Sequence, residues 1–148
     1  MAVSLTKVRD EAPQLVSLVK AVNRVSLDKG LNPAVDKAAV VVSLDDSGSA
    51  QDLYRSGEVQ SVTDLVFAAG LVFDDDGSMP ASFFSSSIKD LGEITLGNCN
   101  GFVAKQHPRW GGTSYVAAIQ WVIEAAGFAH VNLGSSGGGR GGLFGGWG

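Results

Sequence analysis

The sequence has 148 residues, 45% of them hydrophobic, which is typical of a single domain able to bury a sizeable core. Its formal net charge is −4 and its basic residues are scattered, so neither nucleic acid nor a membrane is an expected partner. The single cysteine, Cys99, cannot build an internal disulfide framework. Charges near the start and the lack of a long apolar run argue against a signal peptide or a membrane span. We therefore expect a cytoplasmic protein, or a virion component if the chain is phage-encoded.

The first part of the chain predicts a helix followed by a buried strand. Apolar residues recur every three or four positions over residues 11–29, and Gly30 and Pro33 end that pattern. Residues 38–44 form a short, β-branched, unalternating apolar run, which is typical of a central strand buried on both faces.

The remaining elements follow in an α/β order. The same signals predict a helix over 59–73, strands over 79–85 and 93–96, a helix over 114–126 and a short strand over 128–133. Residues 134–148 are so rich in glycine that we expect a flexible tail after a domain spanning 1–133.

Polar residues with the spacing Asp45-x-Ser47-x-Ser49 directly follow the predicted buried strand. Thr113 precedes a later helix in the same α/β order. The carboxyl ends of strands form the ligand crevice of an open sheet, and carboxylate and hydroxyl oxygens suit a hard cation. The pattern therefore predicts an incomplete Mg²⁺ site made of Asp45, Ser47, Ser49 and Thr113.

The run Val41-Val42-Ser43-Leu44-Asp45-Asp46-Ser47-Gly48-Ser49 resembles the first strand and metal-ion-dependent adhesion motif of von Willebrand factor A (VWA) domains. It is most similar to the bacterial VWA proteins of tellurite resistance and stress response. Further segments in the same order support that subgroup: Leu53 to Gly57, Phe73 to Gly77, Leu96 to Phe102 and Lys105 to Thr113. The resemblance extends from about Glu11 to about Ser136.

Two departures from this family pattern bear on the metal site and the sheet. Family members continue into a strand ending in Thr-Asp-Gly, and its aspartate belongs to the metal site. Ser136 stands at that position here, so it is a weak or lost ligand position and we expect weak Mg²⁺ affinity. The later strands of the family are missing, so we expect a sheet truncated after its fourth strand.

The resemblance implies a VWA or Rossmann-like α/β fold. We expect a mostly parallel four-stranded sheet of order 3-2-1-4, with strand three an antiparallel edge and helices on both faces. Residues 128–133 would then form an exposed edge, which proteins usually pair or cover. We expect a protein partner or self-association there, through an apolar set that includes the tail aromatics: Phe128, Val131, Leu133, Leu143, Phe144 and Trp147.

The resemblance implies a protein-binding module of the tellurite-resistance or stress-response type with a degenerate adhesion site. The alternative is a structural or assembly protein, for example a phage virion component, that docks through its sheet edge and tail. No nucleophile, acid/base pair or cofactor fingerprint is present, so we do not expect an enzyme.

Simpler interpretations stay open for the candidate ligands. Asp45, Ser47 and Ser49 also suit an ordinary loop, in which short polar side chains bond to nearby backbone. Thr113 also suits the N-cap of the helix that follows it.

Other polar residues favour structural roles. Residues 74–76 are three aspartates without the ligand spacing of a calcium loop, so we interpret them as a solvated turn. His107 and His130 lack partners at metal-ligand spacing. Arg140 stands alone among glycines, which favours a linker or docking tail over an RNA-binding segment.

Overall fold

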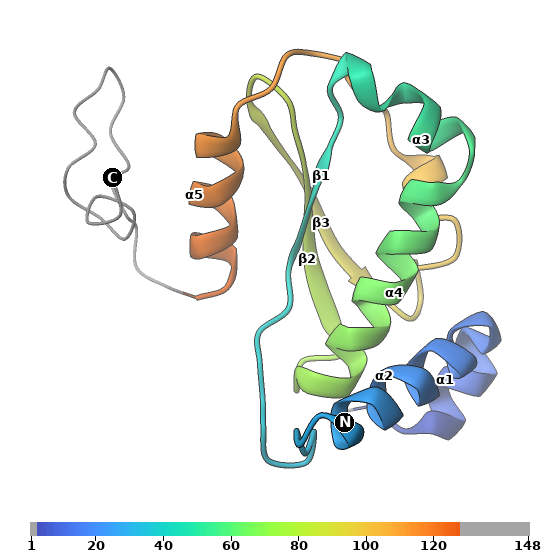
Figure 1. Ribbon diagram of the computed structural model, residues 1–148. Helices are drawn as coiled ribbons and strands as arrows, with labels where there is room; N and C mark the ends of the chain where they lie inside the picture. The colour runs from blue at the N-terminus through green and yellow to red at the C-terminus, as the bar shows by residue number, and fades with distance from the viewer. Residues whose placement is uncertain (1–2, 128–148) are drawn as a thin grey trace.

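The computed structural model describes residues 3–127, in which a sheet lies between α5 on one face and α4 on the other (Figure 1). The expected strand over 128–133 and the expected tail lie outside these residues. The predicted domain boundary between the strand and the tail also lies outside them.

Two helices and a 3-10 turn precede the sheet, where the sequence predicts one helix over 11–29. They are α1 (Leu5–Glu11), the turn η1 (Pro13–Leu15) and α2 (Val16–Asp28). The difference arises at Ala12, whose φ of −145° and ψ of 66° break the helix. Pro13 disfavours helical backbone at the residue before it and starts the new turn.

The sheet has the strand order β1-β2-β3 in the described part of the chain. Its strands are β1 (Val42–Asp45), β2 (Ser78–Phe84) and β3 (Ile88–Thr95). β1 pairs parallel with β2, and β2 pairs antiparallel with β3. The antiparallel edge expected for strand three is confirmed. The described sheet is mixed rather than mostly parallel, and the four-stranded order 3-2-1-4 stays a prediction beyond its first three members.

Two strands differ from their predicted bounds for local reasons. The predicted strand 38–44 begins only at Val42, because the backbone before it is held by the end of α4 instead of by β2. The amides of Ala38 and Val40 donate to the Phe73 carbonyl and to the Asp74 carboxylate. β3 is longer than the predicted 93–96, because Lys89, Asp90 and Gly92 interrupt the apolar pattern of its early residues.

The helices between and after the strands build the two layers. Residues 48–55 form the 3-10 turn η2 (Gly48–Ala50) and α3 (Gln51–Arg55), which lead into α4 (Glu58–Phe73). The short turn η3 (Val103–Lys105) precedes α5 (Tyr115–Ala125). α4 packs between the sheet and α2, and its buried residues join those of β2 in the core: Phe67, Ala68, Leu71, Val72, Met79, Ala81 and Phe83. This core fixes the end of β1 that carries the candidate ligands.

Among residues 3–127, no helix is long and apolar enough to cross a membrane.

Candidate metal centre

The C-terminal end of β1 carries the residues that the sequence predicts as metal ligands. Asp45 is the last residue of β1, and its Oδ1 accepts a hydrogen bond from the backbone amide of Ser47 at 2.8 Å. The hydroxyl oxygens of Ser47 and Ser49 lie 3.2 Å apart. The turn η2 begins at Gly48, between these two serines. A carboxylate and two hydroxyls therefore meet within one tight turn at the end of the strand.

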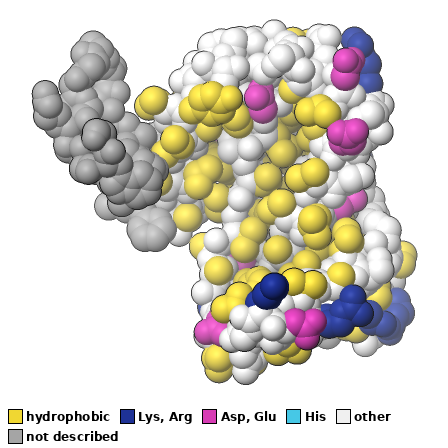
Figure 2. All heavy atoms as spheres, in the orientation of Figure 1, with side chains coloured by type: hydrophobic (Ala, Val, Ile, Leu, Met, Phe, Trp, Pro, Cys, Tyr) yellow, Lys and Arg dark blue, Asp and Glu magenta, His cyan; other side chains and the backbone are white. Residues whose placement is uncertain are grey.

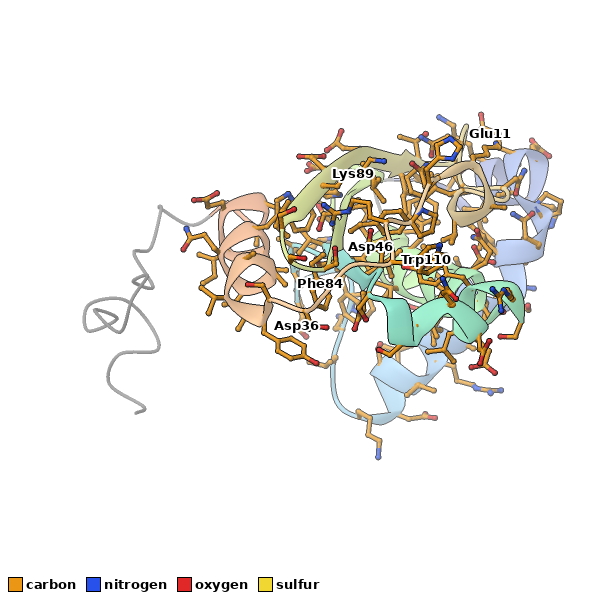
Figure 3. All side chains as sticks on the ribbon, turned by 90° about the horizontal axis from the view of Figure 1, so that it is seen from above. Glu11, Asp36, Asp46, Phe84, Lys89 and Trp110 are labelled. Atoms are coloured by element: carbon orange, nitrogen blue, oxygen red, sulfur yellow. The ribbon has the colours of Figure 1, made fainter. Side chains whose placement is uncertain are left out.

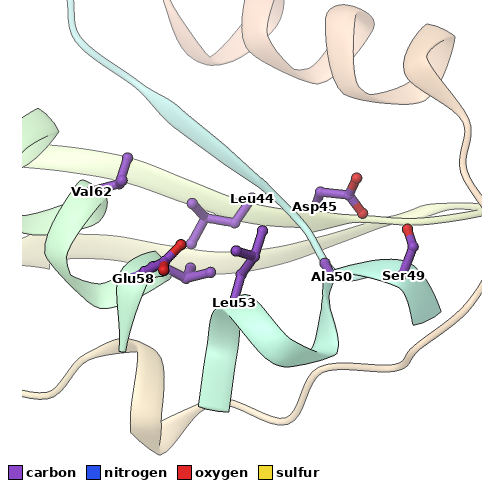
Figure 4. A pocket seen from close by; sticks show the side chains of 8 residues that line it. Leu44, Asp45, Ser49, Ala50, Leu53, Glu58 and Val62 are labelled. Atoms are coloured by element: carbon purple, nitrogen blue, oxygen red, sulfur yellow. The ribbon is translucent and has the colours of Figure 1, made fainter. Parts of the chain in front are cut away.

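A pocket of about 300 Å³ opens beside this turn, and Figure 4 shows the side chains that line it. Asp45 and Ser49 lie at one end of the group, with their oxygens on the same side (Figure 4). Glu58 is a second carboxylate in the lining. The other lining residues are apolar: Leu44, Ala50, Leu53, Val59 and Val62. A ligand held at the Asp45 end would therefore lie next to an apolar surface.

Thr113 lies in a loop that reaches the same end of the sheet before α5 begins. Gly111, two residues earlier, pairs with Ser47 in an isolated parallel bridge. The carbonyl of Gly111 accepts a hydrogen bond from the amide of Gly48 at 3.0 Å. These contacts hold Gly111 against the Asp45–Ser49 turn. They therefore keep the loop that carries Thr113 close to this turn, which a shared site requires.

The residue after Thr113 fixes the start of α5. The amide of Ser114 donates to the carbonyl of Ser85 at 2.5 Å, and Ser114 occupies the N-cap position of α5. The interpretation of Thr113 as the N-cap is therefore wrong. Thr113 is exposed to solvent, so its hydroxyl is accessible to a ligand.

Asp46 is a fully buried carboxylate at this end of the sheet, with an exposed fraction of 0%. Three donors of Arg109 bind it: the backbone amide and Nε at 2.9 Å each, and Nη2 at 3.2 Å. Burial raises the pKa of Asp46, but the hydrogen bonds and charge of Arg109 outweigh burial, so the net pKa lies below its ordinary value. Asp46 is therefore an ionised, paired carboxylate with a structural role.

Sequence patterns do not reveal the Asp46–Arg109 pair, because 63 residues separate its members. The sequence signal that points to a buried ion pair is Asp46 itself, a second aspartate next to Asp45 and directly after a buried strand. A charged residue in such a place requires a partner, and Arg109 lies in the irregular stretch that ends at Thr113.

Tyr54 and Trp110 form a second contact between the β1 end and the loop. Their rings pack edge to face with centroids 5.2 Å apart, and Tyr54 also packs against Phe83 at 5.9 Å. The Tyr54 hydroxyl donates to the backbone carbonyl of Asp45 at 2.8 Å. Burial raises the pKa of Tyr54 far above its usual range, and the charges of Asp46 and Asp45 add to that rise. Tyr54 therefore stays a neutral donor that fixes the backbone of Asp45.

Trp110 adopts left-handed backbone with a φ of 57°, which is rare for a bulky residue and costs on the order of 1–3 kcal/mol. Figure 3 looks down on this end of the sheet, with Asp46, Phe84 and Trp110 labelled. Such a conformation persists only where the surroundings hold it, and the Tyr54 ring and the Arg109 ion pair flank this position.

The donor set fits a hard cation rather than a transition metal. Asp45, Ser47 and Ser49 offer only oxygens, which Mg²⁺ prefers. Within residues 3–127, no three His, Cys, Asp or Glu side chains come close enough together to hold a metal ion. Any cation at the β1 end would therefore depend on hydroxyl and water ligands beside one carboxylate.

Of the other predicted residues, His107 is exposed to solvent, and the rest fall into two groups. Ser136 lies outside the described residues, and so do His130, Arg140 and the apolar set Phe128, Val131, Leu133, Leu143, Phe144 and Trp147. Residues 74–76 form the turn after α4: Asp74 accepts hydrogen bonds from the amides of Val40 and Asp76, and Asp75 pairs with Lys37 at 3.2 Å. These bonds agree with the interpretation of a solvated turn.

The sequence model of a family named vWA-TerF-like, described as the VWA domain found in the TerF C terminus, matches residues 37–131. No curated protein matches the chain. Among solved structures, proximal thread matrix protein 1 from the mussel byssus is similar, with 24% identity over 64% of this chain and 27% of that chain. The TM-score of this match is 0.46.

Proposed function

Because the chain belongs to the family of VWA domains found in the TerF C terminus, we propose that it is a protein-binding module of the tellurite-resistance and stress-response type. In this proposal a divalent cation, Mg²⁺, binds weakly at the end of β1 and links the domain to its partner. Asp45, Ser47, Ser49 and Thr113 are the protein ligands. Ser136 leaves the site one carboxylate short, which is why the binding is weak.

One observation carries the proposal: the oxygens of Asp45, Ser47 and Ser49 meet in a single turn beside a pocket. Asp45 Oδ1 is engaged by the Ser47 amide, which orients the carboxylate and leaves its other oxygen for a cation. The hydroxyls of Ser47 and Ser49 are already within 3.2 Å of each other. The Gly111–Ser47 bridge supports the inclusion of Thr113, which lies two residues further along the same loop.

When bound, the cation supplies the positive charge that attracts a carboxylate of the partner. The chain supplies the remaining contacts. Asp45 offsets part of the cation's charge, and the hydroxyls complete its shell together with water. Leu53 and Val62, which are 47% and 55% exposed, offer apolar surface beside that contact.

We propose binding rather than catalysis as the role of this site. The hydroxyls of Ser47 and Ser49 bond to each other instead of to a histidine or another general base. A serine without such a base is a weak nucleophile, whereas it remains a suitable ligand for a hard cation.

Titration calorimetry with Mg²⁺ tests the proposed ligands. We expect weak, saturable binding that Asp45→Asn abolishes, because the amide removes the only charged ligand among the four. Asp52→Asn is the matched control, since its side chain is 94% exposed on the neighbouring helix α3. Equal Mg²⁺ binding by the wild-type protein and Asp45→Asn would contradict the proposal, and so would the absence of binding.

The second candidate is a structural or assembly protein that docks through its sheet edge. The edge that it would use, residues 128–133, lies outside the described residues. Hydrophobic side chains form a band over the face of the molecule seen in Figure 2, which offers apolar surface for such an assembly. Light scattering tests this role: a stable assembly whose mass is unchanged by Asp45→Asn and by chelation of Mg²⁺ would favour it over the adhesion site.

A further inference from the structure

Arg109 connects three segments that meet at the C-terminal end of the sheet. Its guanidinium binds the buried Asp46 after β1 and also reaches the turn between β2 and β3. There Nη1 donates to the Ser87 hydroxyl at 2.9 Å and Nη2 to the Ser87 carbonyl at 2.7 Å. The backbone amide of Arg109 binds Asp46 as well, so both the side chain and the main chain of this residue are fixed.

The loop after Arg109 has no helix or strand of its own until α5, so contacts with its neighbours set its position. The Gly111 carbonyl binds the amide of Gly48. The amide of Gly112 donates to the Ser86 hydroxyl at 3.3 Å, and the amide of Ser114 donates to the Ser85 carbonyl. Thr113 lies between the last two of these amides.

The charge at this end of the sheet depends on Arg109 too. Asp45 and Asp46 are adjacent, and two free carboxylates so close together would repel each other. Arg109 pairs with Asp46 only, and Asp45 bonds to the Ser47 amide. The charge of Asp46 is thereby balanced within the ion pair, and the Asp45 carboxylate stays available beside the pocket.

We propose that Arg109 is a positioning residue for the metal centre, which it serves by holding the loop that carries Thr113 against the Asp45–Ser49 turn. This inference rests on the proposed function, because it assigns to Arg109 an effect on Mg²⁺ affinity. Arg109 does not contact the cation itself. It acts through the Asp46 and Ser87 contacts, which fix where the loop begins.

Arg109→Lys is the main variant, because lysine keeps the positive charge beside Asp46 but lacks the planar fork that spans Asp46 and Ser87 together. It is expected to fold, whereas Arg109→Ala would leave a buried charge unpaired. Arg55→Lys is the matched control, since Arg55 is an exposed residue of α3 whose side chain contacts Asp52.

The first readout is amide hydrogen exchange without metal, which needs no assumption about the cation. We expect Arg109→Lys to speed exchange at Gly112 and Ser114 and to leave Asp74, whose amide binds the Gly70 carbonyl on α4, unchanged. Arg55→Lys should change none of these three amides. Unchanged exchange at Gly112 and Ser114 in Arg109→Lys would overturn the positioning role.

The second readout is the Mg²⁺ dissociation constant in a double-mutant cycle with Thr113→Val. We expect Arg109→Lys to weaken Mg²⁺ binding about tenfold in the wild-type background and far less in the Thr113→Val background, because both changes remove the same contact. Equal losses in both backgrounds, or no loss in either, would overturn the proposal. If the wild-type protein binds no Mg²⁺, the proposed function fails, and the exchange comparison alone decides the positioning role.

Discussion

Arg109 holds Asp46 with both its main chain and its side chain: the amide and Nε donate to Oδ2 at 2.9 Å, and Nη2 donates to Oδ1 at 3.2 Å. Asp46 is fully buried, and 29% of the Arg109 side chain is exposed. The carboxylate therefore depends on Arg109 for its charge balance, whereas Arg109 keeps some contact with water. Removal of Arg109 therefore leaves a buried charge without a partner, whereas removal of Asp46 leaves Arg109 in partial contact with water.

Arg109→Ala should strongly destabilise the protein, because it leaves Asp46 buried without its cation. We expect a loss of about 3 kcal/mol in the free energy of unfolding, measured by urea denaturation. Arg55→Ala is the control and should lose at most about 0.5 kcal/mol, since its ion pair with Asp52 lies on the surface. Similar small losses in both variants would show that Asp46 does not need Arg109.

Gly111→Ala should disturb the loop more than Gly112→Ala does. A Cβ at position 111 would lie 3.0 Å from Ser85 Oγ and 3.2 Å from Ser86 Oγ, whereas one at position 112 would meet only Ser86 Oγ at 3.6 Å. We expect Gly111→Ala to lose about 1–3 kcal/mol of stability through overpacking and Gly112→Ala to lose less. Thermal unfolding measures both, and a larger loss in Gly112→Ala would refute this account of the close approach.

Tyr54→Phe removes the hydrogen bond to the Asp45 carbonyl but keeps the ring contacts with Phe83 and Trp110. We expect a loss of about 1 kcal/mol in the free energy of unfolding, which is typical of one hydrogen bond. Tyr115→Phe, at a residue that is 65% exposed, is the control and should be close to neutral. A neutral Tyr54→Phe would mean that the hydroxyl does not hold β1.

The raised pKa of the Asp64 carboxyl can be tested through the pH dependence of the protein's stability. Burial raises its pKa above 3.8, while the hydrogen bond from Gln60 Nε2 at 2.8 Å opposes that rise. Just above pH 3.8 the folded protein keeps a proton that the unfolded chain releases, so the wild-type protein loses stability as the pH rises through this window.

Asp64→Asn removes that titration and can still accept the bond from Gln60. Its stability relative to the wild-type protein should therefore increase between about pH 3 and pH 6 and then level off. Asp52→Asn serves as the exposed control. Urea denaturation across this range gives the comparison, and a relative stability of Asp64→Asn that is flat or falls with pH would contradict the raised pKa.

The sequence predicts the elements of the sheet and the turn that follows β1, because hydrophobic periodicity and turn residues are local signals. The run 38–44 correctly indicates a strand, but its start depends on the contacts of Ala38 and Val40 with the end of α4, which no local pattern encodes. The length of β3 is underestimated for a related reason, since its early residues pair with β2 but their apolar pattern is interrupted by Lys89, Asp90 and Gly92.

In the candidate site, too, local sequence patterns predict some residues, and long-range contacts determine the others. Asp45, Ser47 and Ser49 are predicted together because they lie within five residues of one another after a buried strand. Arg109 and Trp110 are missed because their roles depend on contacts with Asp46 and Tyr54, far away in the sequence. Long-range pairs of this kind become visible only when the chain is folded.

The most direct test of the metal centre is its location, measured by adding Mn²⁺, a paramagnetic hard cation, to the isotope-labelled protein and recording amide NMR signals. We expect signals of Ser47 to Ser49 and of Gly111 to Ser114 to broaden first in the wild-type protein, and to persist in Asp45→Asn. Broadening centred on residues 74–76 in both proteins, or no selective broadening at all, would contradict a metal centre at the end of β1.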